Sequence, residues 1–219
     1  MLKLFSFWRS LASYRVRIAL NLKGLTPDEE ADINLMKGAQ RDAAYRAVNP
    51  MMALPALLDG DGPPLFESLA IIEYLDETHP EPPLLPRDAR GRGRVRGLAQ
   101  IVACDCHPLI VPRVREYLEH ELRIDEAARL AWCRHWHVEG LTALETHLGS
   151  PQTGRFCHGD RVTIADICLA SQVAGAQFFN VDLSAFARVM RVAEACLDID
   201  AFARAHPLKQ KGAPAAPPQ

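Results

Sequence analysis

The pattern of apolar and polar positions divides the chain into a first part of short, mixed segments and a second part that is helical throughout. In the first part, short apolar runs alternate with segments whose apolar residues recur at helical spacing, which predicts both strands and helices. We expect, in chain order, a strand at 2–7, a helix at 13–23, a strand at 31–35, a helix at 42–48, strands at 56–58 and 65–66, and a helix at 68–78. The Gly- and Asp-rich segment 59–62 indicates a hairpin between the last two strands.

This order of elements is that of a thioredoxin-like α/β domain, here without a CxxC motif. The second part predicts an all-α bundle with helices at about 90–121, 125–148, 163–179 and 184–204. Between the two parts, four prolines in segment 79–86 cannot continue a helix and predict a stiff linker. The expected organisation is a thioredoxin-like domain at 1–79, a Pro-rich linker at 80–88, an all-helical domain at 89–208 and a disordered tail at 209–219.

The clearest local signal is the start of the third predicted helix of the bundle. Thr163 and Asp166 have the spacing of a helix N-cap with an acidic residue in the first turn, and Val162 and Ile167 can close a hydrophobic staple around it. We interpret this segment as a folding nucleus of the helical domain rather than as a functional site.

Composition excludes several classes of function. The 219 residues carry 25 basic and 27 acidic side chains, a net charge of −2, which gives no overall attraction to nucleic acid or an anionic membrane. We interpret the Arg-rich segment 88–96 as the solvated start of a helix rather than as a phosphate-binding patch. The chain has no apolar run of roughly 18 residues and no signal-peptide pattern, so a cytoplasmic protein without a membrane or nucleic-acid partner is expected.

Metal and redox chemistry have little support in the sequence. The six cysteines do not have the spacing of a zinc or redox motif, and we expect reduced thiols that are mostly buried. His135 and His137 are two positions apart and cannot chelate one metal from one helix face. Motifs for dinucleotides, triphosphates or catalytic zinc do not occur, so no metal site is expected.

Two short segments of the first domain could carry chemistry. Ser10 and Ser13 lie at the start of the first helix, where a hydroxyl and the backbone N–H groups can stabilise an anion such as a thiolate. A simple capping role for either serine is the alternative. Glu67 and Ser68 open the last helix of this domain, where a carboxylate and a helix N-terminus can bind the ammonium and carboxylate of an amino acid. For Ser68, too, capping alone is the alternative.

The segment Trp8-Arg9-Ser10 followed by Ser13-Tyr14-Arg15-Val16-Arg17-Ile18-Ala19-Leu20 resembles the signature of the zeta-class glutathione transferases, which include maleylacetoacetate and maleylpyruvate isomerases. The likeness covers residues 2–208 and is clearest at 49–51, 54–55, 67–75, 105–108, 132–136, 156–160 and 180–183. The resemblance implies a glutathione transferase fold, a homodimer and glutathione as cofactor. It also implies a glutathione site in the first domain and a substrate pocket between the domains.

By position, Ser10 is similar to the family serine that stabilises the glutathione thiolate. The resemblance further implies glutathione contacts at Gln40, Leu54, Pro55, Glu67, Ser68 and His107, and substrate contacts at Arg9, Arg113 and Phe178. The implied reaction is reversible thiolate addition to a cis double bond conjugated to a carbonyl, rotation about the resulting single bond, and elimination to the trans isomer. The substrate is then a small electrophile such as a cis-enol or dicarboxylate.

The chain also departs from the family pattern. Leu11 and Ala12 follow Ser10 where the family usually has a second hydroxyl, and Gln177-Phe178 stands where the isomerases typically carry an arginine. Three hypotheses therefore stay open. The first is an isomerase of the maleylacetoacetate or maleylpyruvate type, the second a transferase that conjugates or dehalogenates a less charged electrophile, and the third a non-catalytic glutathione-binding scaffold.

Overall fold

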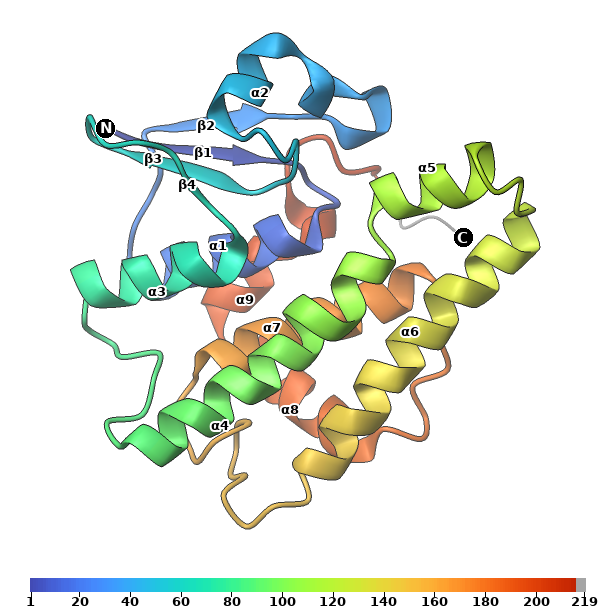
Figure 1. Cartoon of the computed structure of the whole chain (residues 1–219). Helices are drawn as coiled ribbons and strands as arrows, with labels where there is room; N and C mark the ends of the chain where they lie inside the picture. Colours follow the sequence, from blue (N-terminus) through green and yellow to red (C-terminus); the bar gives the residue numbers. More distant parts are fainter. Residues whose placement is uncertain (216–219) are drawn as a thin grey trace. The chain divides into compact units, whose positions relative to one another are not determined.

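In a computed structural model, residues 1–215 are described, and the chain divides into two compact units. Unit 1 comprises Met1–Pro83 together with the residues from Asp200 onward, and unit 2 comprises Leu84–Ile199. Unit 1 contains a small sheet with helices on its faces, and unit 2 is built of helices (Figure 1). The expected α/β and all-α parts are therefore both present.

Unit 1 is organised around a four-stranded sheet of order β2-β1-β3-β4. The strands are β1 (Leu2–Ser6), β2 (Glu29–Asp32), β3 (Ala56–Asp59) and β4 (Leu65–Phe66). β1 pairs with β2 in parallel and with β3 antiparallel, and β4 forms the predicted hairpin with β3. Figure 1 shows α1 (Leu11–Leu22) and α3 (Ser68–Thr78) along one face of this sheet and α2 (Ala43–Val48) on the other.

The apolar pattern explains both layers of unit 1. Phe5 and Phe7 pack with Tyr45 of α2 on one face of the sheet. Towards α1 and α3, the inward side chains such as Ile18 and Ile72 are completely buried. The element bounds moved by about two residues from those expected, because Ser10 rather than Ser13 caps α1 and because β2 ends before the apolar residues that follow it.

The last helix differs from the expected domain organisation. α9 (Asp200–Ala205) groups with unit 1, whereas the sequence pattern assigned residues up to 208 to the helical domain. Its carbonyls accept hydrogen bonds from α1: Asn21 Nδ2 donates to Ala201 O over 2.9 Å, and the Tyr14 hydroxyl donates to Phe202 O over 3.5 Å. The amide of Gln210 donates to Arg204 O and to His206 O, so the tail begins as an ordered segment. The disorder expected at 216–219 lies outside the described residues.

Unit 2 contains more elements than the pattern predicted. They are α4 (Ala89–Gln100), a π-helix (Ile101–Cys106), a 3₁₀ turn (His107–Leu109), α5 (Pro112–His120), α6 (Glu126–His147), α7 (Ile164–Phe178) and α8 (Ala187–Leu197). The single helix expected at 90–121 is wrong. Pro108 and Pro112 lack the N–H group that a continuing helix needs. Pro108 lies within the 3₁₀ turn, and Pro112 begins α5. The helix expected at 184–204 is likewise divided, into α8 and α9.

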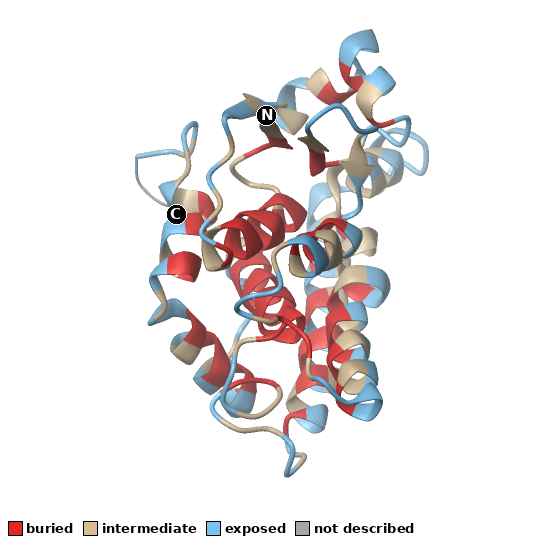
Figure 2. Ribbon diagram, turned by 90° about the vertical axis from the view of Figure 1, so that its left-hand side faces the viewer, coloured by how far each residue is buried: buried red, intermediate tan, exposed pale blue. Residues whose placement is uncertain are grey.

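α7 is the core of unit 2, and its residues from Ile164 to Ala176 are all buried (Figure 2). The predicted capping box is confirmed at its start. Asp166 Oδ2 accepts from Thr163 N–H over 2.8 Å and from the Thr163 hydroxyl over 2.7 Å, and Oδ1 accepts from Cys157 N–H over 2.7 Å. Burial raises the pKa of Asp166, and these hydrogen bonds oppose the rise.

The cysteines and the Arg-rich segment show how the composition of the chain is used in the fold. The six cysteines are free thiols, of which five are buried and Cys104 is exposed, as expected. In the Arg-rich segment, Asp88 caps α4, and Arg94 donates to Cys157 O over 2.6 Å and to Thr153 Oγ1 over 2.9 Å. Among residues 1–215, no cluster suited to a metal ion occurs, and no helix is long and apolar enough to span a membrane.

Candidate functional site

Strand register brings most of the predicted site residues of unit 1 to one edge of the sheet. In the ladder, Phe5 lies opposite Ala56, and Ala56 lies opposite Phe66. The end of β1, the start of β3 and the end of β4 are therefore neighbours. The loop carrying Ser10 leaves this edge, Leu54-Pro55 enters it, and Glu67-Ser68 leaves it. β2 runs parallel to β1 and ends at the same edge, and the chain then leads to Gln40.

Ser10 forms the N-cap of α1. Its Oγ accepts a hydrogen bond from Ser13 N–H over 3.1 Å, and Ser10 N–H donates to Phe7 O over 3.0 Å. The capping alternative for Ser10 is thus confirmed as a structural fact, and it leaves the hydroxyl proton of Ser10 able to donate to a further group. The first turn of α1 contains no acidic residue. The positive end of this helix therefore has no negative charge of its own to neutralise it.

Glu67 has a backbone conformation that non-glycine residues rarely adopt, with φ 66° and ψ 121°. It is the N-cap of α3, but its side chain makes no capping hydrogen bond. Ser68, the next residue, is buried and is the first residue of α3. Strained backbone of this kind concentrates at ligand-binding sites, where the surrounding structure holds it in place. Here it positions the start of α3 at the same edge of the sheet as Ser10.

Gln40 lies in a 3₁₀ turn (Ala39–Arg41) and is only 7% exposed. Its Oε1 atom is buried and has no hydrogen-bond partner among the described residues. An unpartnered buried amide oxygen costs free energy unless a ligand or water donates to it. This atom therefore fits the backbone N–H of a peptide-like ligand.

Leu54 and Pro55 are both buried, and the peptide bond between them is cis. The turn before them is held by two donors on one acceptor. The Tyr45 hydroxyl donates to Ala53 O over 2.6 Å, and Asn49 Nδ2 donates to the same oxygen over 2.9 Å. Burial also raises the pKa of the Tyr45 hydroxyl, which keeps it protonated as a donor. The sequence did not reveal this support, because the two donors belong to α2 and its C-cap, four and eight residues before Ala53.

Arg9 belongs to unit 1 and is partly buried in the loop before Ser10. His107, Arg113 and Phe178 belong to unit 2. Arg113 is exposed in the first turn of α5, His107 is partly buried at the start of the 3₁₀ turn, and Phe178 is the last residue of α7. In unit 2, Phe178 packs against a small cluster made by Ile110, Cys133 and Phe179 with Trp132, Trp136 and Val181.

Sequence reasoning missed two arginines, Arg115 of α5 and Arg134 of α6, that contact Phe179, the C-cap of α7. The Arg115 guanidinium lies over the Phe179 ring, 5.6 Å from its centroid, and its Nε is buried without a hydrogen-bond partner among the described residues. Arg134 Nε donates to Phe179 O over 2.9 Å. Positive charge is therefore present beside Phe178-Phe179, although α7 itself supplies none there. Only the abundance of arginine in the predicted helices hinted at this.

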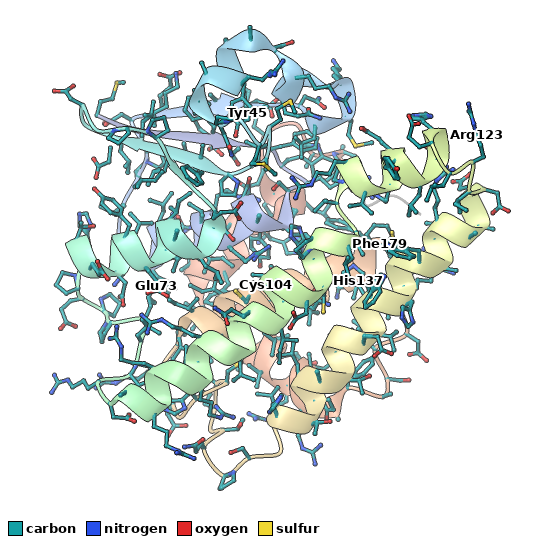
Figure 3. The ribbon with its side chains drawn as sticks, in the orientation of Figure 1. Tyr45, Glu73, Cys104, Arg123, His137 and Phe179 are labelled. Carbon is teal, nitrogen blue, oxygen red and sulfur yellow. The ribbon has the colours of Figure 1, made fainter. Side chains whose placement is uncertain are left out.

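His137 packs against the same aromatic residue, its ring 5.4 Å from that of Phe179 (Figure 3). It is completely buried, and neither ring nitrogen has a hydrogen-bond partner among the described residues. Burial lowers its pKa to about 4, so the ring is neutral near pH 7. This environment is that of a core residue.

Known proteins are similar to this chain over nearly its whole length. Residues 4–83 match the family model described as the N-terminal domain of glutathione S-transferases. The chain is 47% identical over 210 residues to the maleylpyruvate isomerase of Ralstonia sp, covering 95% of this chain and 98% of that protein.

Two solved structures are also similar. One is a maleylacetoacetate isomerase from Methylobacterium extorquens AM1 with bound malonate and glutathione, at a TM-score of 0.95 and 50% identity, covering 97% of this chain and 100% of that chain. The other is a holo maleylpyruvate isomerase described as a bacterial zeta-class enzyme, at a TM-score of 0.92 and 46% identity, with the same coverage. These similarities span both units, and the chain therefore belongs to the zeta class of the glutathione transferase family.

Proposed function

We propose that this protein is a glutathione-dependent cis-trans isomerase that acts on small, negatively charged substrates of the maleylpyruvate or maleylacetoacetate type. The observation that carries the proposal is the start of α1, where Ser10 forms the N-cap and the first turn contains no acidic residue. The similarity to isomerases over nearly the whole chain supports the same reaction. Glutathione, when bound, supplies a thiolate that adds reversibly to the conjugated double bond and so permits rotation about it.

The residues of unit 1 fit glutathione on four grounds. The Ser10 hydroxyl and the N–H groups of α1 favour an anionic sulfur, since a donor and a helix N-terminus both lower the pKa of a thiol. Gln40 Oε1 is a buried acceptor in need of a donor. Glu67 and the first N–H groups of α3 offer a carboxylate and an anion site for the ammonium and carboxylate of one amino acid. Leu54, next to the cis peptide bond, offers backbone groups for pairing with a peptide.

For the substrate, we assign carboxylate contacts to Arg9 and Arg113, with Phe178 as an apolar neighbour and His107 as a further glutathione contact. The arginine that is missing at Gln177-Phe178 weakens the case for a dianionic substrate, because neither Gln nor Phe can pair with a carboxylate as Arg does. The Arg115 guanidinium near Phe178-Phe179 supports a charged substrate all the same. The relative bound to malonate shows that a dicarboxylate is held by a protein of this kind.

The second candidate is a transferase that conjugates or dehalogenates a less charged electrophile. It is favoured by the uncharged last turn of α7, in which Gln177 is exposed and Phe178 is partly buried. The two candidates differ in what happens to the thiol. An isomerase leaves the concentration of free glutathione unchanged, whereas a conjugating enzyme consumes it.

We further propose a cytoplasmic homodimer. Support comes from large apolar side chains of unit 1 that are exposed in the single chain, such as Met51 at 60% and Phe66 at 54%. Sedimentation of the purified protein tests this directly, with a mass of two chains expected and a mass of one chain contradicting it.

The function is tested by incubating the protein with maleylpyruvate and glutathione and following both the isomers and the free thiol. The expected result is conversion of the cis to the trans isomer, dependent on glutathione, without loss of thiol. Loss of thiol together with an α-halo acid or aryl halide, and no conversion of the cis isomer, would establish the second candidate instead. If neither reaction occurs although glutathione binds, the chain is a binding scaffold.

A further inference from the structure

Arg17, on α1, is a buried cation to which the proposed mechanism assigns no role. The residue is 6% exposed. Burial lowers the pKa of its guanidinium to about 10, and the charges of Glu30 and Tyr14 oppose this fall. The group therefore stays protonated at neutral pH. A charged group is rarely buried to this extent unless its hydrogen-bond donors are satisfied.

The hydrogen bonds of Arg17 go to two segments, the end of β1 with the residues after it and the end of α9. Nη1 donates to Ser6 Oγ over 2.9 Å and to Phe7 O over 3.4 Å, and Nη2 donates to Trp8 O over 3.3 Å. Nε donates to Ala205 O, the last carbonyl of α9, over 3.2 Å. The three nitrogens of one planar group thus hold three consecutive residues at the end of β1 and the end of α9.

One of these acceptors is shared with Ser10. The Phe7 carbonyl receives both Arg17 Nη1 and the backbone N–H of Ser10, the latter over 3.0 Å. Fixing this peptide group fixes the point from which the Ser10 backbone turns into α1. The bond from Ser13 N–H to Ser10 Oγ then sets the direction of the hydroxyl. A continuous chain of contacts therefore leads from the buried guanidinium to the proposed thiol-binding hydroxyl.

We propose that Arg17 is a positioning residue of the glutathione site, which holds the Phe7–Ser10 turn so that the Ser10 hydroxyl faces the thiol, and that α9 is part of the same support. The inference rests on the proposed function, since it concerns the thiol chemistry of that site. It also gives a reason why residues from Asp200 onward group with unit 1 rather than with the helical unit.

Two other roles for Arg17 predict different results. If the positive charge acts directly on the thiolate, its effect does not depend on Ser10. If Arg17 only stabilises the fold, its removal lowers the thermal midpoint without changing the thiol. Lys23 provides a matched control, because it is another buried cation of the same segment and forms the C-cap of α1. Its Nζ donates to Asp76 Oδ1 and to Pro82 O, each over 2.6 Å.

The test is a pH titration of the ultraviolet absorbance of the glutathione thiolate bound to four proteins: wild type, Arg17→Met, Ser10→Ala and the double variant. Arg17→Met is expected to raise the pKa of the bound thiol by about one unit, which lowers the ratio of thiolate to thiol about tenfold at a given pH. In the Ser10→Ala background the same change is expected to have almost no effect, because both groups act through one hydroxyl. Lys23→Met is expected to lower the thermal midpoint and leave the titration unchanged.

The possible results separate the roles. An equal shift in both backgrounds would show direct action of the charge and overturn the proposal. An unchanged titration with a lowered thermal midpoint would also overturn it, because Arg17 would then behave like Lys23. If Arg17→Met does not fold, Arg17→Lys keeps the charge but replaces the three-nitrogen fork by a single donor group, and a smaller shift in the same direction is expected. If the wild type binds glutathione without lowering its thiol pKa, the proposed function fails, whatever the variants do.

Discussion

The N-termini of α1 and α7 have similar cap residues but different roles. Each starts from a hydroxyl residue, Ser10 or Thr163, just before a largely buried helix. At α7, the carboxylate of Asp166 occupies the first turn and accepts three hydrogen bonds. At α1, the first turn has no acidic residue, and Ser10 accepts a single bond of 3.1 Å.

The difference shows how one local motif serves either stability or chemistry. A helix N-terminus that binds its own carboxylate stabilises the fold and has no further capacity for an anion. A helix N-terminus without one keeps its N–H groups and its dipole for a ligand. Asp166 closes the N-terminus of α7, which is therefore structural. The corresponding residue of α1 is Ser13, which carries no charge, so the N-terminus of α1 stays open to a thiolate.

The largest effect on stability is expected at the closed start. Asp166→Ala leaves two backbone N–H groups and the Thr163 hydroxyl without their acceptor in a buried environment, at a cost of about 3–5 kcal/mol in the free energy of unfolding. Denaturant titration measures it. Asp160→Ala is the control, because Asp160 is exposed and Oδ1 accepts one bond from Arg155 N–H. Equal, small losses in both variants would mean that the carboxylate of Asp166 does not stabilise α7.

The completely buried ring of His137 on α6 predicts a pH dependence of stability. Burial lowers its pKa from 6.5 to about 4, so the unfolded chain takes up a proton near pH 6.5 and the folded chain does not. The free energy of unfolding is therefore expected to fall by about 3 kcal/mol as pH drops from 6.5 to 4, and this contribution is fully present above pH 6.5. Denaturant titrations at several pH values should show a shallower fall for His137→Leu. Parallel pH profiles of wild type and variant would contradict the assignment.

A carboxylate can be introduced into the first turn of α1, so that it resembles the first turn of α7. Ser13→Asp places a carboxylate where α7 carries Asp166 and converts the open start into a capping box. The negative charge beside the anion site is expected to move the pKa of bound glutathione by about one unit towards that of free glutathione. Ser13→Asn has a similar volume and no charge, and it should shift the titration much less. If Ser13→Asp and Ser13→Asn behave alike, the absence of charge at α1 is not what matters.

The smallest effect is expected for the hydroxyl of the capping box. Thr163→Ala removes one hydrogen bond to Asp166 and keeps the backbone bond, at a cost of about 1 kcal/mol. Thr146→Ala is a suitable control in α6, where an exposed threonine donates to Thr142 O within the helix. Thermal unfolding should distinguish the two variants. An unchanged midpoint in Thr163→Ala would show that Asp166 alone makes this cap.

Much of the fold was predictable because local rules act on neighbouring residues. The hairpin at 56–66, the capping box of α7 and helix α3 follow from turn residues, spacing and caps. The division of the helix expected at 90–121 follows from Pro108 and Pro112, but the π-helix before them was not predictable, because a wider helical turn has no composition of its own. The assignment of α9 to unit 1 depends on hydrogen bonds to α1 across about 180 residues, which no local pattern encodes.

The site was predictable in part for the same reason. Ser10, Leu54-Pro55 and Glu67-Ser68 were recognisable from motifs, and strand register explains why they meet at one edge. The unpartnered oxygen of Gln40 and the contacts of Arg17 depend on three-dimensional packing. In the sequence, Arg17 is only one of two arginines in a helical signature, and nothing there shows that its side chain is buried.

The most direct test of the proposed thiolate site is the pH titration of the glutathione thiolate absorbance in wild type and in Ser10→Ala. We expect the thiol pKa in wild type to lie well below that of free glutathione. In Ser10→Ala the thiol pKa should rise and the isomerase activity should fall about 10²-fold. Ser13→Ala, which keeps the backbone N–H that donates to Ser10 Oγ, is the control and should leave the titration close to wild type. A wild-type protein that binds glutathione without a thiolate band at neutral pH would contradict the account.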